Sequence, residues 1–343
     1  MNENTTILTI NGLLLLLPKL NLLAIITKDI LTAKKFLDAK ELVAVPTETV
    51  YGLAANGTAV VAIKKIFEAK GRPINNPLIL HFKDVASIGP YVMQMSDEIT
   101  KLASHFWPGP LTLLLPKSAI VPEIVTAGSN RVAVRVPNHT MTLELLKSLD
   151  YPLAAPSANP SGYISPTSSE HVEKQLGEKI PLILDGGACK SGIESTILGW
   201  ENDRPIIYRK GAITADQIGG VLGKMPKFKN KSDVLEAPGM SSSHYAPNTK
   251  TLVVENAGET VALHADKKVG LIVFKKSGGQ KVVKEIILSP KASLEEMAQN
   301  LYAAMHQLDE LQLDIIIIEK APEEGIGGAI NDRLQRSAFN HQQ

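Results

Sequence analysis

The apolar residues of this chain follow two spacings. Short runs rich in Val, Ile, Leu and Ala, bounded by Pro, Gly or Asp, are typical of buried strands. Longer stretches in which apolar residues recur every three or four positions are typical of helices with one buried face. In the first two thirds of the chain these patterns predict strands at 25–26, 42–45, 78–82, 111–115, 132–136, 153–155, 182–184, 196–198 and 206–209, and helices at 28–39, 60–69, 97–106, 141–148 and 171–176.

These strands and helices mix without strict βαβ repetition. We therefore expect an open, twisted, mixed sheet with helices on its faces. Thr27 is expected to cap the first helix. Beyond a basic stretch near residue 225, near-continuous apolar strands at 251–254, 269–274 and 314–319, with a helix at 293–310, predict a small Rossmann-like parallel sheet.

The predicted organisation is an α/β protein in four parts. A chain of 343 residues is long for one domain, since typical domains hold about 100–200 residues. The parts are an N-terminal extension at 1–24, a larger mixed-sheet domain at 25–218, a linker at 219–250 and a small α/β domain at 251–343.

Charge and cysteine content exclude several classes of protein. The formal net charge is +1, so no overall field draws the chain to nucleic acid or to a membrane. The single cysteine, Cys189, excludes an intrachain disulfide framework and a multi-cysteine zinc site, and it fits a reducing cytoplasm.

The leader is rich in leucine, but Pro18 and Lys19 interrupt it. It is too short and too broken to span a bilayer, which needs about 20 consecutive apolar residues. Its first residues also lack the basic start of a signal peptide. We expect an apolar extension and no membrane partner.

The densest group of polar side chains follows the strand that Pro46 ends. Proline cannot donate to a strand ladder, so the chain turns there, and hydroxyls at Thr47, Thr49 and Tyr51 gather around the carboxylate of Glu48. Such hydroxyls suit a small polar substrate.

Two cations, Lys70 and Arg72, follow the next helix in a loop that contains Gly71 and Pro73. Cations held in a loop of this kind suit a polyanion such as a triphosphate.

Common nucleotide and hydrolase motifs are missing. The sequence has no Gly-x-x-x-x-Gly-Lys-Ser/Thr loop, which excludes a P-loop NTPase. The glycines at 185–187 and 325–328 do not form Gly-x-Gly-x-x-Gly, so a dinucleotide dehydrogenase is disfavoured. Ser157 lacks the flanking glycines of a hydrolase nucleophile elbow.

Six motifs occur in a fixed order. They are Pro-Thr-Glu-Thr-Val-Tyr-Gly-Leu from Pro46, Lys-Gly-Arg-Pro from Lys70 with Asn-Pro-Leu after it, Trp-Pro-Gly-Pro-Leu-Thr from Trp107, Arg-Val-Ala-Val-Arg-Val-Pro from Arg131, Ala-Pro-Ser-Ala-Asn-Pro-Ser-Gly from Ala155 and Glu-Ser-Thr-Ile from Glu194. Together they resemble the YrdC-type threonylcarbamoyl-AMP synthases. The chain continues past that domain, as in the long two-domain form of the family.

The resemblance implies an L-threonylcarbamoyladenylate synthase, a nucleotidyltransferase. L-threonine and bicarbonate would give an N-carboxylate that attacks the α-phosphate of ATP, and pyrophosphate would leave. A separate transferase would then take the product to tRNA, for the threonylcarbamoyladenosine modification next to the anticodon, in the cytoplasm. Mg²⁺ is expected mainly on the phosphates, because no acidic cage is visible and Glu48 is the nearest carboxylate.

The resemblance also implies residue roles. The catalytic set around the triphosphate would be Lys70, Arg72, Ser157 and Asn159. L-threonine would be bound by Thr49, His81, Arg135, Ala155 and Ser195. ATP would contact Arg72, Asn76, Arg131, Ser157, Ser165, Arg209 and Tyr245.

Three alternatives remain open at this point. The first is a non-catalytic RNA-binding module of the same fold, against which the near-neutral charge argues, although a local basic concavity could still bind RNA weakly. The second is a carbamoyl-transfer maturation factor, whose cysteine-rich zinc segments this chain lacks. The third is a small-molecule-binding protein with a vestigial site.

The segment from Ser243 to Pro247 resembles the interdomain segment of the family, which folds back over the active site. A lid of this kind would exclude water from a labile adenylate. A plain tether is the alternative.

Overall fold

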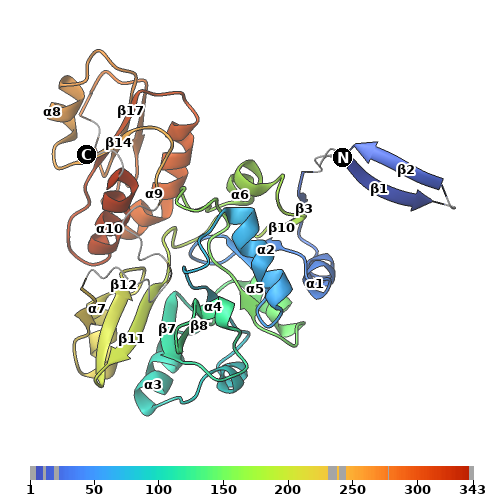
Figure 1. Ribbon diagram of the computed structural model, residues 1–343. Helices are drawn as coiled ribbons and strands as arrows, with labels where there is room; N and C mark the ends of the chain where they lie inside the picture. The colour runs from blue at the N-terminus through green and yellow to red at the C-terminus, as the bar shows by residue number, and fades with distance from the viewer. Residues whose placement is uncertain are drawn as a thin grey trace.

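The computed structural model describes residues 5–10, 13–18, 23–230, 238, 245–276 and 278–339. The helices and strands of these residues build a large domain around one sheet and a smaller domain around a second, with a separate hairpin at the N-terminus (Figure 1).

The main sheet is mixed, as the sequence predicts. Its strand order is β13-β12-β11-β7-β8-β6-β9-β5-β4-β10-β3, with both parallel and antiparallel neighbours. The strands are β3 (Ile25–Thr27), β4 (Val43–Val45), β5 (Gly52–Asn56), β6 (Ile79–His81), β7 (Leu111–Pro116), β8 (Arg131–Arg135), β9 (Leu153–Ala154), β10 (Leu182–Leu184), β11 (Thr196–Glu201), β12 (Arg204–Arg209) and β13 (Lys227–Phe228).

Helices pack on this sheet, and several of them begin at a side chain that caps their first turn. The first one begins at Ile30, two residues later than expected, because Asp29 rather than Thr27 caps it and accepts from two backbone N–H groups. The helical segments of this domain are α1 (Ile30–Asp38), α2 (Val60–Lys70), the 3₁₀ helix η1 (Ala86–Tyr91), α3 (Asp97–Phe106), α4 (Glu123–Thr126), α5 (Thr140–Lys147), α6 (Ser169–Leu176) and α7 (Ala215–Leu222).

The second sheet is small and entirely parallel, in the order β14-β17-β15-β16. This confirms the expected parallel arrangement and adds one edge strand that the sequence pattern did not reveal. Its elements are β14 (Thr251–Val254), α8 (Ala257–Ala262), β15 (Val269–Val273), β16 (Lys284–Ile287), α9 (Leu294–Asp309), β17 (Ile315–Glu319) and α10 (Gly327–Ala338).

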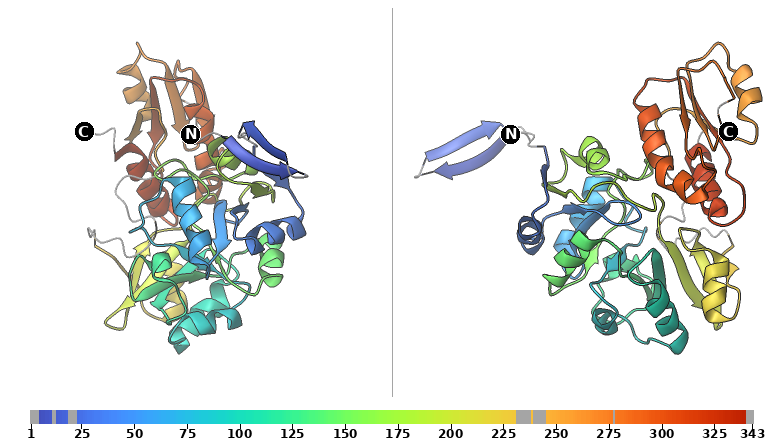
Figure 2. Two further views of the ribbon diagram at one scale, coloured as in Figure 1. Left: turned by 45° about the vertical axis from the view of Figure 1, so that its right-hand side comes forward. Right: turned by 180° about the vertical axis from the view of Figure 1, so that it is seen from behind.

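The leader forms an element that was not predicted from the sequence. β1 (Thr5–Ile10) and β2 (Leu13–Pro18) pair as an antiparallel hairpin that projects from the large domain (Figures 1 and 2). In the part of the chain that the structure describes, no helix combines the length and the apolar character needed to cross a membrane.

The two domains share a hydrophobic cluster. α9 and α10 lie between the small sheet and the large domain (Figure 2). Met297, Leu301 and Ile330 from these helices belong to the same buried cluster as Ile164 and Ile193 of the large domain. Burying apolar surface between the domains fixes α9 and α10 against the end of the main sheet where the candidate site lies.

Candidate functional site

A cavity opens where several strands of the main sheet end. His81 ends β6, Arg135 ends β8 and Arg209 ends β12, while Ser195 directly precedes β11. Of the residues predicted for the site, the cavity is lined by Thr49, Arg72, His81, Arg135, Ala155, Ser157, Ser195, Arg209 and Tyr245. Lys70, Asn76, Arg131, Asn159 and Ser165 do not line it.

Arg135 is held by a buried carboxylate. Its Nη2 lies 2.7 Å from Glu48 Oε1, and both side chains are less than a tenth exposed. Arg135 also donates to Thr49 Oγ1 at 3.1 Å and to the carbonyl of Gly109 at 3.2 Å, and Asn138 N donates to Glu48 Oε2. Glu48 therefore orients Arg135 through a buried ion pair.

His81 faces the cavity as a neutral ring. Burial lowers the pKa of His81 to about 3, and the nearby Arg135 contributes in the same direction. Its Nδ1 is buried and has no hydrogen-bond partner among the described residues. A buried polar atom of this kind is suited to a hydrogen bond with a bound ligand.

Arg72 reaches the cavity from the loop after α2. This helix ends at Gly71, whose φ of 61° lies in the left-handed region that glycine adopts without strain. Arg72 Nη2 donates to Asn76 Oδ1 at 2.5 Å and to the carbonyl of Pro77 at 2.8 Å. Burial lowers the pKa of Arg72 to about 10, so it stays cationic at neutral pH.

Lys70 holds the backbone of the loop at 157–159. Its Nζ donates to the carbonyl of Ser157 at 2.6 Å and to the carbonyl of Asn159. Burial lowers the pKa of Lys70 well below its usual value, and Arg72 contributes to the shift. Asn159 in turn donates to the carbonyls of Pro160 and Tyr163 at 2.9 and 2.8 Å. Lys70 and Asn159 therefore shape the cavity wall through backbone groups.

Arg209 and Ser195 form the opposite wall. Arg209 donates to Ser195 O at 3.1 and 3.0 Å, to Ser195 Oγ at 3.1 Å and to the carbonyl of Pro238 at 3.1 Å. Ser195 Oγ also lies 2.8 Å from Thr112 Oγ1. The two segments approach closely at Gly211, where a Cβ atom would stand 2.4 Å from Thr196 N.

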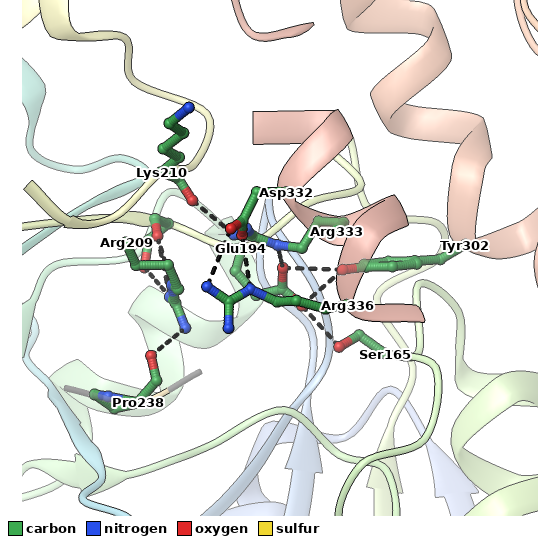
Figure 3. A network of polar contacts seen from close by, with 10 residues as sticks. Ser165, Glu194, Arg209, Lys210, Pro238, Tyr302, Asp332, Arg333 and Arg336 are labelled. Carbon is green, nitrogen blue, oxygen red and sulfur yellow. Dashed lines mark hydrogen bonds and ion pairs between the residues drawn. The ribbon is translucent and has the colours of Figure 1, made fainter. Parts of the chain in front are cut away.

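Glu194 is a cavity residue that was not predicted from the sequence. Its carboxylate accepts hydrogen bonds from Ser165 Oγ at 2.7 Å, from Tyr302 Oη at 3.1 and 3.2 Å and from Arg333 Nε at 2.7 Å (Figure 3). Ser165, predicted to contact ATP, thus contacts Glu194 instead of lining the cavity. Glu194 opens the Glu-Ser-Thr-Ile motif, which was the signal in the sequence that could have pointed to it.

Known proteins share this arrangement of domains. A family model described as telomere recombination (Sua5, YciO and YrdC) matches residues 35–211, and the model for the C-terminal domain of threonylcarbamoyl-AMP synthase matches residues 213–339. Threonylcarbamoyl-AMP synthases of Pyrococcus abyssi and Bacillus subtilis are each 40% identical to this chain, over 89% and 90% of it and 93% of their own length. The chain belongs to the threonylcarbamoyl-AMP synthase family.

Solved structures support the same assignment for the fold. The P. abyssi Sua5 structure in complex with L-threonine superposes with a TM-score of 0.87 at 38% identity, covering 93% of this chain and 98% of that one. This threonylcarbamoyl-AMP synthase family member therefore has the two-domain form, with one family domain at 35–211 and the C-terminal domain at 213–339.

One residue predicted for ATP lies away from the cavity of this synthase family member. Arg131 is at the start of β8, at the opposite end from Arg135. Its Nη1 donates to Tyr208 Oη at 2.7 Å, and its guanidinium lies 5.0 Å from the centre of the Tyr208 ring. Its assignment to ATP stays a prediction that this geometry does not favour.

The linker of this family member contributes Tyr245 to the cavity. Tyr245 is 1% exposed, stacks on Tyr302 with 5.7 Å between ring centres and lies 5.1 Å under the guanidinium of Arg333. Ser243 and His244, which the lid hypothesis includes, lie outside the described residues. Among the residues that are described, no group of three or more His, Cys, Asp or Glu side chains could hold a metal.

Proposed function

We propose that this chain makes L-threonylcarbamoyladenylate and pyrophosphate from L-threonine, bicarbonate and ATP. The observation that carries the proposal is the convergence of Arg72, Arg135 and Arg209 on one buried cavity, beside the hydroxyls of Thr49 and Ser195. Three guanidinium groups in one enclosed space match a ligand set that carries several negative charges. The family and the L-threonine complex of a relative support the choice of substrates.

Threonine is assigned to the part of the cavity at the ends of β6 and β8. Arg135, already oriented by Glu48, offers its charge to the threonine carboxylate, and Thr49 and Ser195 offer hydroxyls to its polar groups. The neutral ring of His81 places Nδ1 there as a hydrogen-bonding atom without adding a charge. Ala155 closes the site with a small apolar wall.

The triphosphate is assigned to the side formed by Arg72, Ser157 and Arg209. Lys70 and Asn159 support this side by fixing the backbone at 157–159. Catalysis then comes from positioning the carboxylated threonine in line with the α-phosphate and from stabilising the charge that develops on the leaving pyrophosphate. The two carboxylates at the site, Glu48 and Glu194, are each paired with an arginine, so Mg²⁺ would be held mainly by the phosphates and water.

Tyr245 covers one side of the cavity. Because the ring is buried between Arg333 and Tyr302 and also lines the cavity, it keeps water from that side of the adenylate. The product would pass to a separate tRNA threonylcarbamoyl transferase in the cytoplasm.

The test is a reaction balance with the wild-type chain. Pyrophosphate release from MgATP is measured with L-threonine and bicarbonate together and with each omitted in turn, and the adenylate is identified by mass spectrometry. We expect release only with both co-substrates. ADP and inorganic phosphate as products, or release that does not depend on threonine, would contradict the proposal.

A further inference from the structure

Glu194 belongs to the large domain, but the small domain supplies most of its contacts. Tyr302 from α9 and Arg333 from α10 both donate to the carboxylate, and Arg333 Nε lies 2.7 Å from Glu194 Oε2 (Figure 3). The Arg333 side chain is 1% exposed and that of Glu194 is 7% exposed. A charge pair so fully removed from water holds its partners in place, because each charge left alone would be costly.

Arg333 also binds the chain segment that carries Arg209. Its Nη2 donates to the carbonyl of Lys210 at 2.7 Å. Glu194 directly precedes Ser195, and Lys210 directly follows Arg209. The Arg333 guanidinium therefore binds the residue before Ser195 and the residue after Arg209, and both Ser195 and Arg209 line the cavity.

Charge balance decides where Arg209 points. The hydrogen bonds of Arg209 go to Ser195 and to the Pro238 carbonyl, all neutral groups, while the nearby Glu194 is engaged by Arg333. Burial raises the pKa of the Glu194 carboxyl, but Arg333 and Arg209 more than offset this, so its pKa lies below the usual value. The ionised carboxylate would attract Arg209 directly if Arg333 were removed.

We propose that Arg333 is a positioning residue for ATP binding, which acts by engaging Glu194 so that Arg209 stays directed at the cavity. The inference rests on the proposed function, since ATP is the ligand assigned to Arg209. It gives the small domain a defined role, because helix α10 then sets the direction of one arginine at the ATP site.

The first test is Arg333→Met in the full chain, with affinities for MgATP and for L-threonine measured by calorimetry. We expect ATP to bind about tenfold more weakly or worse, with threonine affinity within about threefold of wild type. The double variant Glu194→Gln with Arg333→Met removes the anion that would attract Arg209, so it should regain most of the lost ATP affinity. A merely structural role predicts that ATP affinity and threonine affinity fall together in the single variant and recover together in the double variant, because neutralising Glu194 also relieves an unpaired buried charge.

Lys174→Met is the matched control. Lys174 on α6 pairs with Glu310 of the small domain at 2.6 Å, so this change also removes an ion pair between the domains, but at an exposed position remote from the cavity lining. Its ATP affinity should stay within about twofold of wild type. If Lys174→Met weakens ATP as much as Arg333→Met does, the effect comes from domain docking and the proposal is wrong.

A conservative variant and a ligand-free structure complete the test. Arg333→Lys keeps a cation beside Glu194 and should bind ATP within about threefold of wild type. This variant tests the proposal even if Arg333→Met does not fold. A tenfold loss of ATP affinity in the folded lysine variant would overturn the proposal. A crystal structure of Arg333→Met without ligand should show Arg209 within about 4 Å of the Glu194 carboxylate, and an unmoved Arg209 would overturn the proposal. If wild type itself fails to bind ATP, the proposed function is wrong. The ligand-free structure of Arg333→Met still shows whether Arg333 keeps Arg209 away from Glu194.

Discussion

Lowering the pH from 7 to 5 should weaken the folded state through His306, a histidine at the contact between the domains. The ring lies on α9, its Nε2 is 3.1 Å from the carbonyl of Ser165, and it contacts the His171 ring in a tilted arrangement with 4.2 Å between ring centres. Burial lowers the pKa of His306 to about 3, and His171 contributes in the same direction, while Asp309 opposes the shift. Lys174 is the other charged group that affects it, and it too lowers the pKa.

The sign and the size follow from proton linkage. The pKa of His306 is lower in the folded chain than its ordinary value of 6.5, so the unfolded chain takes up the proton first as pH falls. Its contribution to stability is therefore fully present above pH 6.5 and decreases steadily down to about pH 3. At pH 5, about 1.5 pH units below the ordinary value, the loss is about 2 kcal/mol. His81, with a pKa also lowered to about 3, adds a loss of similar size.

The assay is urea unfolding of wild type and of His306→Gln at pH 7 and pH 5, followed by circular dichroism. Glutamine keeps a donor for the Ser165 carbonyl but does not titrate. The difference in unfolding free energy between the two pH values should be smaller by about 2 kcal/mol in the variant. His105→Gln, at an exposed position on α3, serves as the control and should behave as wild type. Equal pH dependence in wild type and His306→Gln would refute the reasoning.

Three further outcomes test the site. Arg72→Met should lower turnover by about 10²-fold, on the scale of one lost charge-stabilising donor. Arg131→Met, which lies outside the cavity, should keep activity within a few fold of wild type. Equal losses in a pyrophosphate assay would contradict the placement of ATP. Lys70→Met should lower the melting temperature as well as activity, because its Nζ holds two backbone carbonyls; a drop in turnover at unchanged melting temperature would indicate direct ligand contact instead. Tyr245→Ala should shorten the half-life of the enzyme-bound adenylate, measured by chromatography, and an unchanged half-life would leave the linker as a tether.

The elements with a strong apolar signal were predictable from the sequence. The near-continuous Ile and Leu runs that became β17 and β7 stand out because each is buried along nearly its whole length. β5 was missed, since Gly52–Asn56 consists of small residues with little strand preference. β16 was missed because it is a short edge strand with charged residues at its start.

The site was predictable as a set of cations and hydroxyls but not as a geometry. Arg72, Arg135 and Arg209 are far apart in the sequence, and only the strand order brings them to one cavity. The roles of Lys70 and Glu194 depend on partners in distant segments, such as Arg333, which no local pattern specifies. Local spacing carries information about helices and strands, whereas long-range pairing of charges is a property of the folded chain.

The position of Arg333 along the chain has a consequence for biosynthesis. α10 follows every segment that lines the cavity, so a ribosome completes β12 and Arg209 long before it makes the partner of Glu194. At about 5–20 residues per second, the stretch between Arg209 and Arg333 takes on the order of 10 s to synthesise. During that interval the nascent chain carries most of the active site with its charges unbalanced. Translation products that stop before α10 lack the partner of Glu194, so they should bind ATP at least about tenfold more weakly than the finished chain, as Arg333→Met does.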